Sequence, residues 1–443
     1  MLLSRVIQTS HKITIAALFV TIVGAASFFS YSLYKEKQIA CIGAVAKALE
    51  IRDYSLVSRL LRQHVDTTVS VAALEAVQDS SFSRALHKAE SIKQMDAALR
   101  ISLKELLLCT FFIETELPSS IENHKYYLKK EETGLSCNLE YDPETKLCFI
   151  LLEGIKGGRI GRGKFKKVWK AVLYAQDRVE IVARAEQRLP MEKEVAMMRC
   201  LRGVPGIFET IAFTRHEDAG IQYTTVYSKL YTHSSLQKLF DKKVALDTTD
   251  KVAIARQILQ GLQELHKRHI LHCDLGARNY LVAILQNEHK KQVKRQVRCV
   301  ISDFGRAVLL DEVNTAARLQ GNTSYIAPEA LFRESMQEAD YFASEVFAVG
   351  CVLYNLFYEK RAGWQLPHYG QDTRERAVVY DEYVQHIRTL RDERYRVLSE
   401  KVQSGSKLSV EEQFEHLVLK MVDPDPKARG SAAELAVLFE AML

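Results

Sequence analysis

Three short stretches in the second half of the chain carry the residue types that chemistry on phosphate groups needs. Asp274 and Asn279 lie in the stretch HCDLGARN, and Asp303 follows in the stretch SDFG. Carboxylate and amide oxygens are ligands that Mg²⁺ accepts, and Mg²⁺ neutralises phosphate charge. A third stretch, IAPE at residues 326–329, follows in the position of a substrate-loop anchor. The order of the three stretches predicts magnesium-assisted transfer of a phosphoryl group.

With these motifs the chain resembles the eukaryotic-type protein kinases from about Ile155 to its C-terminus. The resemblance implies an α+β, bilobal protein-kinase fold over residues 150–443. A small β-rich N-lobe would occupy about 150–228 and a larger helical C-lobe about 232–443. The apolar pattern agrees, because short β-branched runs begin at Leu147 and helical periodicity follows them.

The resemblance also assigns roles to the three polar residues. Asp274 would accept the proton of the substrate hydroxyl, while Asn279 and Asp303 would bind the Mg²⁺ ions that bridge the ATP phosphates. It therefore implies ATP and Mg²⁺ as cofactors and a protein as substrate. The alternative is a fold that kept the shapes of its loops after losing catalysis. The presence of all three residues together favours activity.

A glycine-rich stretch lies upstream of these motifs, in the order that the family follows. Residues 160–168 read IGRGKFKKV and match G-x-G-x-x-G-x-V except at the third glycine, where Lys166 stands. Glycines let the backbone of a hairpin approach phosphates closely. The resemblance implies nucleotide contacts from this loop, the following strands and the hinge between the lobes: Gly161, Gly163, Lys166, Val168, Ala183, Lys229 and Tyr231.

The family's phosphate-binding lysine is absent from its usual place. Where the family reads V-A-I-K, this chain reads VARA, which ends in Ala185. The stretch GRGKFKKVWK at 161–170 resembles the glycine loop of the "with no lysine" kinases, in which a lysine of this loop supplies the missing amine. The resemblance implies that Lys166 contacts the phosphates and pairs with Glu194, with Glu192 as the second candidate. The alternative is a basic hairpin that is merely solvated.

Two other positions depart from the family pattern, and two agree with it. Cys273 replaces the arginine that clamps a phosphorylated activation segment, which predicts activity independent of that phosphorylation. Glu345 stands where the family has an aspartate that holds the catalytic loop, and we expect its extra length to loosen that loop. Glu329 and Arg429 match the family's buried ion pair, which argues against a small-molecule kinase.

The hydroxyl that would be phosphorylated is ambiguous. The stretch GARN at 276–279 resembles the tyrosine kinases, whereas GNTSYIAPE at 321–329 resembles the substrate loop of serine/threonine kinases. We expect a serine/threonine kinase and leave tyrosine open.

An apolar stretch near the N-terminus predicts a membrane anchor. No charged residue occurs from Ile13 until Lys35, and the 13–34 stretch is long enough for a transmembrane helix. A cleaved signal peptide is the alternative. Because a working kinase needs ATP, we expect a single-pass membrane protein whose kinase domain faces the cytosol.

Residues 36–120 are predicted to form a helical juxtamembrane or regulatory segment, because their apolar residues recur on one helical face. These positions are Val45, Leu49, Leu56, Leu60, Ile92, Met95, Leu99, Leu103 and Leu106. Two other functions stay open. One is a nucleotide-binding pseudokinase acting as a membrane scaffold, and the other is a scaffold whose helical segment is the working part.

Composition narrows the remaining choices. The formal charge of +6 is mild for 443 residues, and no nucleic-acid-binding module is visible, so we expect no nucleic acid partner. The eight cysteines are scattered without a C-x-x-C pair, which indicates neither a disulfide framework nor a zinc site and favours a reducing compartment. A basic cluster at 289–298 is predicted to be the solvated face of a longer hairpin, and a docking patch is the alternative.

Overall fold

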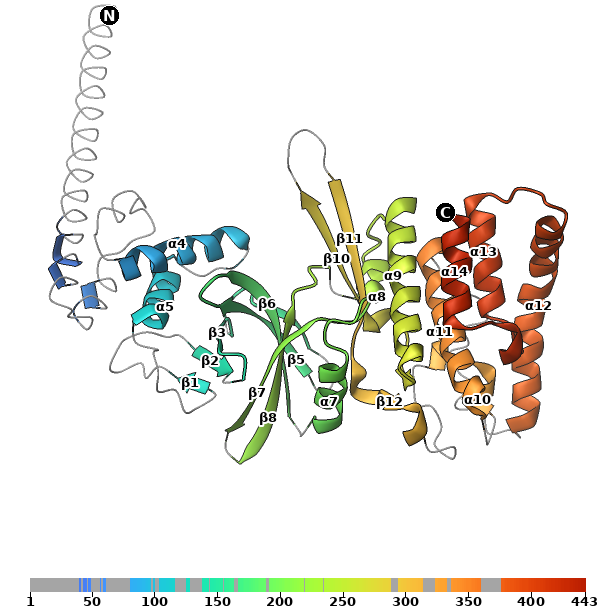
Figure 1. Ribbon diagram of the computed structural model, residues 1–443, viewed down its shortest axis with the longest axis horizontal. Helices are drawn as coiled ribbons and strands as arrows, with labels where there is room; N and C mark the ends of the chain where they lie inside the picture. Colours follow the sequence, from blue (N-terminus) through green and yellow to red (C-terminus); the bar gives the residue numbers. More distant parts are fainter. Residues whose placement is uncertain are drawn as a thin grey trace, which may run out of the picture. The chain divides into compact units, whose positions relative to one another are not determined.

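A computed structural model gives the fold of the chain (Figure 1). It describes residues 40, 43–45, 47–48, 56, 59–60, 80–96, 99, 103–115, 125–127, 138–142, 144–153, 155–162, 166–188, 191–218, 220–233, 235–287, 294–313, 323–332, 336–359 and 376–443. The predicted membrane helix at 13–34 and the predicted site residue Gly163 lie outside the described residues. The chain divides into two compact units, one of residues 1–184 with 214–216 and one of residues 185–213 with 217–443.

Among the described residues, the first unit combines helices α4 and α5 with a mostly antiparallel group of strands. Its elements are α4 (Ser80–Met95), α5 (Leu103–Thr115), β1 (Lys125–Tyr127), β2 (Asn138–Asp142), β3 (Leu147–Leu151), β4 (Arg159–Arg162), β5 (Lys166–Tyr174) and β6 (Val179–Arg188), whose last residues enter the second unit. The strands follow the order β1-β2-β3-β5-β6, and β4 pairs with β5 beside this path. The pairs β1–β2, β2–β3, β3–β5 and β4–β5 are antiparallel.

The helices and strands of this unit share one hydrophobic core. Ile92 of α4 and Leu106 of α5 are buried with Ile150 of β3 and Val172 of β5. The predicted apolar face of the helical segment is therefore confirmed at most of the described positions. Met95 is an exception, since 44% of it is exposed. It is the last residue of α4, where the packed face of that helix ends.

Polar contacts also join the helices to strand β5. Glu114 of α5 accepts hydrogen bonds from the Tyr174 hydroxyl at 2.6 Å, from Lys88 Nζ at 3.0 Å and from Arg84 Nε at 3.3 Å. Burial alone would raise the pKa of the Glu114 carboxyl, but these hydrogen bonds and the charge of Lys88 outweigh it and hold that pKa below its ordinary value. Glu114 is therefore a charged anchor between both helices and the strand.

The second unit begins with a helix and a strand pair and continues as a largely helical body. Its elements are α7 (Glu192–Cys200), β7 (Thr210–Asp218), β8 (Ile221–Lys229), α8 (Leu236–Asp241), α9 (Thr248–Lys267), β9 (Ile270–Leu271), β10 (Tyr280–Asn287), β11 (Lys294–Ile301), β12 (Val308–Leu309), α10 (Pro328–Phe332), α11 (Glu338–Tyr358), α12 (Arg376–Gln403), α13 (Val410–Met421) and α14 (Ala432–Met442). Short 3₁₀ turns include η1 (Ala277–Asn279), η2 (Phe304–Arg306) and η6 (Pro426–Ala428). The predicted order of strands followed by helices is confirmed, with the strand pair β10–β11 inserted among the helices.

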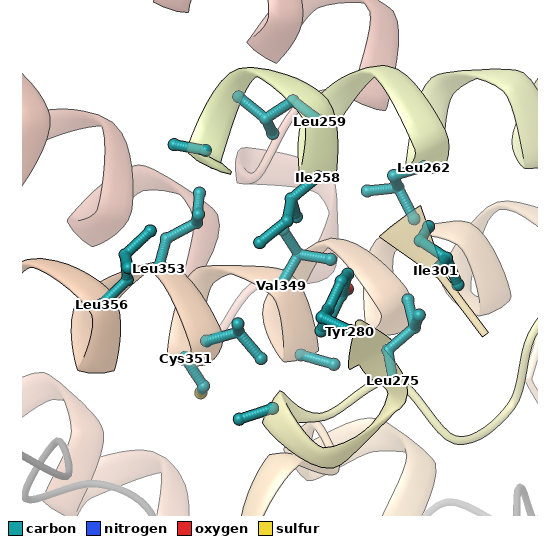
Figure 2. Packing of buried hydrophobic residues seen from close by; sticks show 14 of the residues in the cluster. Ile258, Leu259, Leu262, Leu275, Tyr280, Ile301, Val349, Cys351, Leu353 and Leu356 are labelled. Carbon is teal, nitrogen blue, oxygen red and sulfur yellow. The ribbon is translucent and has the colours of Figure 1, made fainter. Parts of the chain in front are cut away.

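Helices α9 and α11 form the centre of the second unit's core. Figure 2 shows Ile258 of α9 close to Val349 of α11, with Tyr280 beside them, and Leu262 of α9 close to Ile301 of β11. Residues 339–358 form the one described helix that is apolar and long enough to cross a membrane, but 78% of that window is buried inside the protein. It is therefore the core helix around which the catalytic loop is built.

Candidate active site

The catalytic loop is fixed by the carboxylate of Glu345 on the core helix α11. One oxygen, Oε1, accepts the backbone N–H groups of His272 at 2.7 Å and Cys273 at 2.8 Å. The other, Oε2, lies 3.1 Å from Nε2 of His266 on α9. Cys273 has a φ of 59°, a left-handed conformation that costs energy for a non-glycine residue and needs such support. The expectation that Glu345 loosens the loop was wrong, because its side chain reaches both amides directly.

Asp274 is oriented by two neighbours on the same loop. Asn279 Nδ2 donates to the backbone oxygen of Asp274 at 2.7 Å and to its Oδ2 at 3.2 Å. One guanidinium nitrogen of Arg278 lies 2.9 and 3.0 Å from the two carboxylate oxygens of Asp274. The structure thus brings together the predicted catalytic residues Asp274 and Asn279. It adds Arg278, whose only signal in the sequence was a cation four positions after the aspartate.

The loop that carries Asp303 is bonded to this catalytic loop. Ser302 donates its backbone N–H and its hydroxyl to the Asn279 carbonyl oxygen, at 2.8 and 2.9 Å. His272 Nε2 lies 3.0 Å from the Ser302 carbonyl oxygen, and the His272 ring packs 5.1 Å from the Phe304 ring. Asp303 follows Ser302 with a left-handed φ of 69° and leads into the turn η2. The two predicted metal ligands, Asn279 and Asp303, therefore lie on loops that are tied to each other.

Glu194 lies beside the same turn. It projects from α7, is buried, and its Oε2 would be 3.4 Å from a Cβ built on Gly305. Oδ1 of Asp303 would be 3.7 Å from that same position. Two carboxylates that flank one glycine repel each other unless a cation lies near them. This part of the second unit is suited to attract a metal ion or an ammonium group.

The donor set fits a magnesium ion that is bound together with a nucleotide. Asn279 uses its amide nitrogen for Asp274, so its amide oxygen is the atom left for a metal. Among the described residues no group of three or more His, Cys, Asp or Glu side chains could hold a metal ion alone. Mg²⁺ commonly takes one or two protein oxygens and completes its shell with phosphates and water. Asn279 and Asp303 would supply that protein share.

The glycine-rich stretch forms part of an antiparallel hairpin. Strand β4 pairs with β5, and Gly161 lies opposite Val168. Side chains alternate along a strand, so Lys166 and Val168 share one face of β5 while the exposed Lys167 lies on the other. Lys166 belongs to the first unit and Glu194 to the second, and their pairing stays a prediction.

Arg184, which precedes the alanine at the family's lysine position, forms ion pairs within the first unit. Arg184 is fully buried in the first unit, where its Nε lies 3.3 Å from Glu140 Oε2 and its Nη1 is paired with Glu153. Ala183 and Ala185 flank it and lie on the opposite face of β6, both half-buried. Arg184 therefore cannot take the place of the lysine that the family carries at 185.

The predicted hinge residues lie at the end of strand β8, which Lys229 closes, and just beyond it at Tyr231. Tyr231 is buried, and this burial raises the pKa of its hydroxyl to about 12. The Lys229 side chain lies 3.3 Å from the Glu209 carboxylate, while its backbone N–H donates to the Glu209 carbonyl at 3.2 Å. The Lys229 carbonyl oxygen accepts the Ser228 hydroxyl at 3.4 Å, so only its second lone pair remains for a nucleotide.

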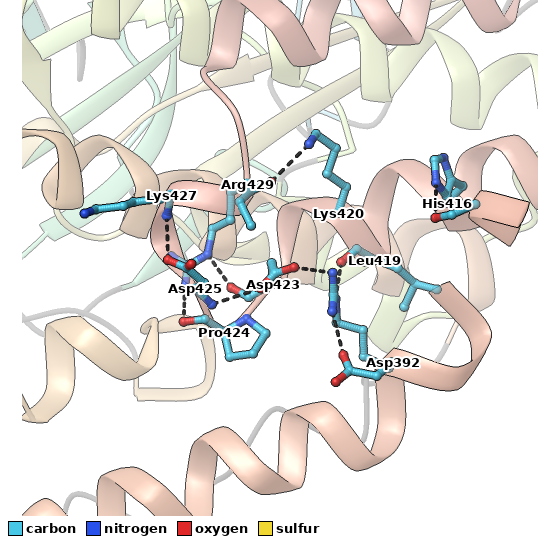
Figure 3. Close-up of polar contacts among 12 residues, drawn as sticks. Asp392, His416, Leu419, Lys420, Asp423, Pro424, Asp425, Lys427 and Arg429 are labelled. Carbon is cyan, nitrogen blue, oxygen red and sulfur yellow. Dashed lines mark hydrogen bonds and ion pairs between the residues drawn. The ribbon is translucent and has the colours of Figure 1, made fainter. Parts of the chain in front are cut away.

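The predicted buried ion pair of the helical body is confirmed. Glu329 and Arg429 are both fully buried, and two nitrogens of Arg429 bond the two carboxylate oxygens at 2.5 and 2.9 Å. Arg429 also donates to the carbonyl oxygens of Ala343 at 2.9 Å and Asp423 at 2.6 Å. Figure 3 shows Arg429 inside the loop that runs from Asp423 to Lys427.

Comparison with known proteins agrees with this geometry. The family model "Protein kinase domain" matches residues 155–437. The chain is 28% identical over 202 residues to "Probable serine/threonine-protein kinase zyg-1" of Caenorhabditis briggsae, which covers 45% of this chain and 26% of that protein. It is 27% identical over 248 residues to "Calcium-dependent protein kinase 27" of Arabidopsis thaliana, covering 55% of this chain and 44% of that protein.

A human relative, "Dual specificity testis-specific protein kinase 2", is 27% identical over 235 residues, which covers 52% of this chain and 38% of that protein. The chain thus spans less than half the length of each of these curated relatives. The family model covers well over half of the chain and includes the three motifs, the glycine-rich stretch and the Glu329–Arg429 pair. This chain belongs to the protein kinase family.

Proposed function

We propose that this chain is a protein kinase that transfers the γ-phosphate of Mg·ATP to a serine or threonine hydroxyl of a protein. One observation carries the proposal: Glu345 holds a strained catalytic loop on which Asn279 is bonded to Asp274. The left-handed conformation of Cys273 costs free energy, and we expect such strain to be kept where the loop still takes part in catalysis. The printed names of the two zyg-1 relatives support serine or threonine as the acceptor, whereas the "dual specificity" in the name of the human relative keeps tyrosine open.

The residues of the second unit would divide the work as follows. Asp274 accepts the proton of the hydroxyl, with its carboxylate held in place by Arg278 and Asn279. Asn279 and Asp303 hold Mg²⁺, which neutralises the phosphate charge when the nucleotide is bound. The hydrogen bonds of Ser302 and His272 fix the two loops relative to each other. The base then lies beside the acceptor hydroxyl while the metal ligands lie beside the phosphate that this hydroxyl attacks.

An active enzyme needs an amine in place of the phosphate-binding lysine that is absent at Ala185, and we propose that Lys166 supplies it. Lys166 shares its strand face with Val168, which the family resemblance places against the nucleotide. Arg184 is excluded as a substitute because it is fully buried and paired with two carboxylates, those of Glu140 and Glu153. The two carboxylates beside Gly305 would give the Lys166 ammonium a partner in Glu194.

Transfer of labelled phosphate tests the proposed activity. The full chain is needed, because helices α4 and α5 share a core with strands β3 and β5. We expect Mg·ATP-dependent incorporation into a generic protein substrate, and no incorporation by Asp274→Asn at equal folded concentration. Incorporation by the wild type that does not exceed that of Asp274→Asn would favour the second candidate, a nucleotide-binding pseudokinase, which Ala185 itself suggests.

We also propose that residues 13–34 anchor the protein in a membrane as a single span, with the kinase domain in the cytosol. The support is an uncharged stretch long enough to span the hydrocarbon core. Carbonate extraction of cell membranes should leave the full chain in the pellet and release a variant that lacks 13–34. Release of the full chain would contradict the anchor.

A further inference from the structure

The second unit contains a cavity that the proposed reaction does not use. It has a volume of about 500 Å³ and lies among the end of α9, the start of α11 and the segment that leads through η6 into α14. Its apolar lining comes from Phe342 and Val346 of α11, Pro426 of η6 and several alanines. Ligand sites typically have this volume and this predominantly apolar lining.

The charge at this cavity is positive. Lys267 and Lys427 both line it, both are exposed, and neither ammonium forms an ion pair with a residue that the structure describes. Figure 3 shows the Lys427 side chain extending away from Asp425 and Asp423. The one carboxylate in the lining, Glu434, is engaged at the start of α14, where it accepts the Ser431 N–H at 2.8 Å. An apolar floor with two ammonium groups at its edge suits an amphiphilic anion.

The wall of the cavity leads directly to the catalytic loop. His266 lines it and packs its ring 4.6 Å from the ring of Phe342. Nε2 of His266 lies 3.1 Å from Glu345 Oε2, and the other oxygen of Glu345 holds the amides of His272 and Cys273. A ligand that packs against Phe342 and His266 is thus separated from the strained loop by one carboxylate.

We infer that this cavity binds a small amphiphilic anion, a carboxylate or phosphate on an apolar chain, and that its occupancy stabilises the catalytic loop through His266 and Glu345. The apolar chain packs on Phe342 and Val346, while the anionic group lies between Lys267 and Lys427. Fixing the His266 ring strengthens its bond to Glu345, which holds the amides of the loop more firmly. The effect on catalysis rests on the proposed function, whereas binding does not.

Calorimetry on the full chain tests binding, with decanoate, decyl phosphate, uncharged decanol and acetate as probes. We expect decanoate or decyl phosphate to bind at one site, and the tighter of the two identifies the preferred anionic group. Decanol and acetate should bind much more weakly. The pair of changes Lys267→Glu and Lys427→Glu should weaken binding about tenfold or more. Lys407→Glu, an exposed lysine before α13, should leave it unchanged.

A second variant, Ala433→Trp, fills the cavity from an exposed position of its lining and should abolish binding. Decanoate and decyl phosphate both failing to bind, or binding equally to the charge-reversed and filled variants, would overturn the site.

Hydrogen exchange tests the coupling without requiring activity. Binding should slow exchange of the His272 and Cys273 amides, and this slowing should be lost in His266→Phe, which keeps a ring but cannot bond Glu345. In an active enzyme, kcat should also rise about fivefold. Binding without slower exchange would overturn the coupling. If no phosphate is transferred at all, the proposed function fails, while the binding and exchange results still decide the cavity.

Discussion

At the residue scale, a single carboxylate determines the shape of the catalytic loop. Glu345 stands one methylene further from the backbone than the family's aspartate, and both of its oxygens find partners in His266, His272 and Cys273. Hydrogen bonds to a charged group are stronger than neutral ones, so this arrangement can hold Cys273 in a left-handed conformation. Helix α11 therefore supports the loop through Glu345, and α9 supports it indirectly through His266.

Glu345→Ala should lower the free energy of unfolding by roughly 1.5–3 kcal/mol, because buried N–H groups lose a charged acceptor. It should also reduce kcat more than it raises KM for ATP, because the base Asp274 loses its position rather than its nucleotide. Urea unfolding and steady-state kinetics measure the two effects. Glu411→Ala, at an exposed position of α13, is the control and should stay within about 0.5 kcal/mol. Equal stability of both variants would show that Glu345 does not hold the loop.

The Glu329–Arg429 pair offers a second test on single residues. Glu329→Gln or Arg429→Met alone leaves one buried charge without its partner, which should cost about 3–5 kcal/mol in unfolding free energy. The double variant Glu329→Gln/Arg429→Met should lose less than the sum of the two, because no charge is then buried alone. Additive losses in urea unfolding would argue against a coupled pair.

Sequence motifs identified candidate site residues that lie together in one short stretch. They missed residues whose contacts are with distant parts of the chain. Asp274 and Asn279 could be predicted because they lie five positions apart in one loop. Arg429 could be predicted because it occupies a recognisable place in the family pattern. The role of His266 could not, because its partner Glu345 lies 79 positions further along the chain. Nothing local in the sequence of α9 indicates that contact.

At the scale of elements, helices α4 and α5 are part of the small strand-rich unit. Their apolar face could be predicted from the helical periodicity of the sequence. That strands β3 and β5 cover this face could not. The strands at 125–127 and 138–142 were also not predicted, because both precede Leu147, where the β-branched runs begin. Strand pairing is non-local, and β2 gains its stability from β3 and from the buried pair between Glu140 and Arg184.

Leu106→Ala should therefore destabilise the whole first unit by about 2–5 kcal/mol, since it opens a cavity between α5 and the strands. Met95→Ala removes a side chain of similar size from the exposed end of α4 and should cost less than about 0.5 kcal/mol. Thermal or urea unfolding compares the two. A loose helical linker would give the same small loss for both.

The anchor at Glu114 predicts a dependence on pH. The pKa of this carboxyl is lowered in the folded protein, so its contribution is present above the ordinary value of 4.5 and is lost as pH falls through the folded pKa. The stability advantage of the wild type over Glu114→Gln should thus be largest near neutral pH and should shrink as pH falls below about 4.5. Unfolding experiments from pH 7 to pH 3 measure this difference. An advantage that does not change with pH would show that the ion pairs contribute nothing.

At the scale of the whole molecule, family membership follows from the motifs of the second unit and from the β4–β5 hairpin. Activity depends on how the chain replaces the lysine that is absent at Ala185. The second unit carries the proposed base Asp274, the proposed metal ligands Asn279 and Asp303, and a catalytic loop that Glu345 holds. The cation that the family places at 185 is missing there, and Arg184 is used in the core of the first unit. A chain that transfers phosphate must take its ammonium from another position, and Lys166 lies on the strand face that the resemblance assigns to the nucleotide.

The most direct measurement is kcat/KM for Mg·ATP in the full chain carrying Lys166→Met, beside Lys167→Met and the double change Lys166→Met/Ala185→Lys. Lys167 lies on the opposite face of the same strand and is the matched control. We expect Lys166→Met to lose roughly 100-fold or more, as when a preorganised charge is removed, Lys167→Met to stay near wild type, and the double variant to regain part of the loss. Unchanged turnover in Lys166→Met, or equal losses at positions 166 and 167, would contradict a relocated phosphate-binding amine.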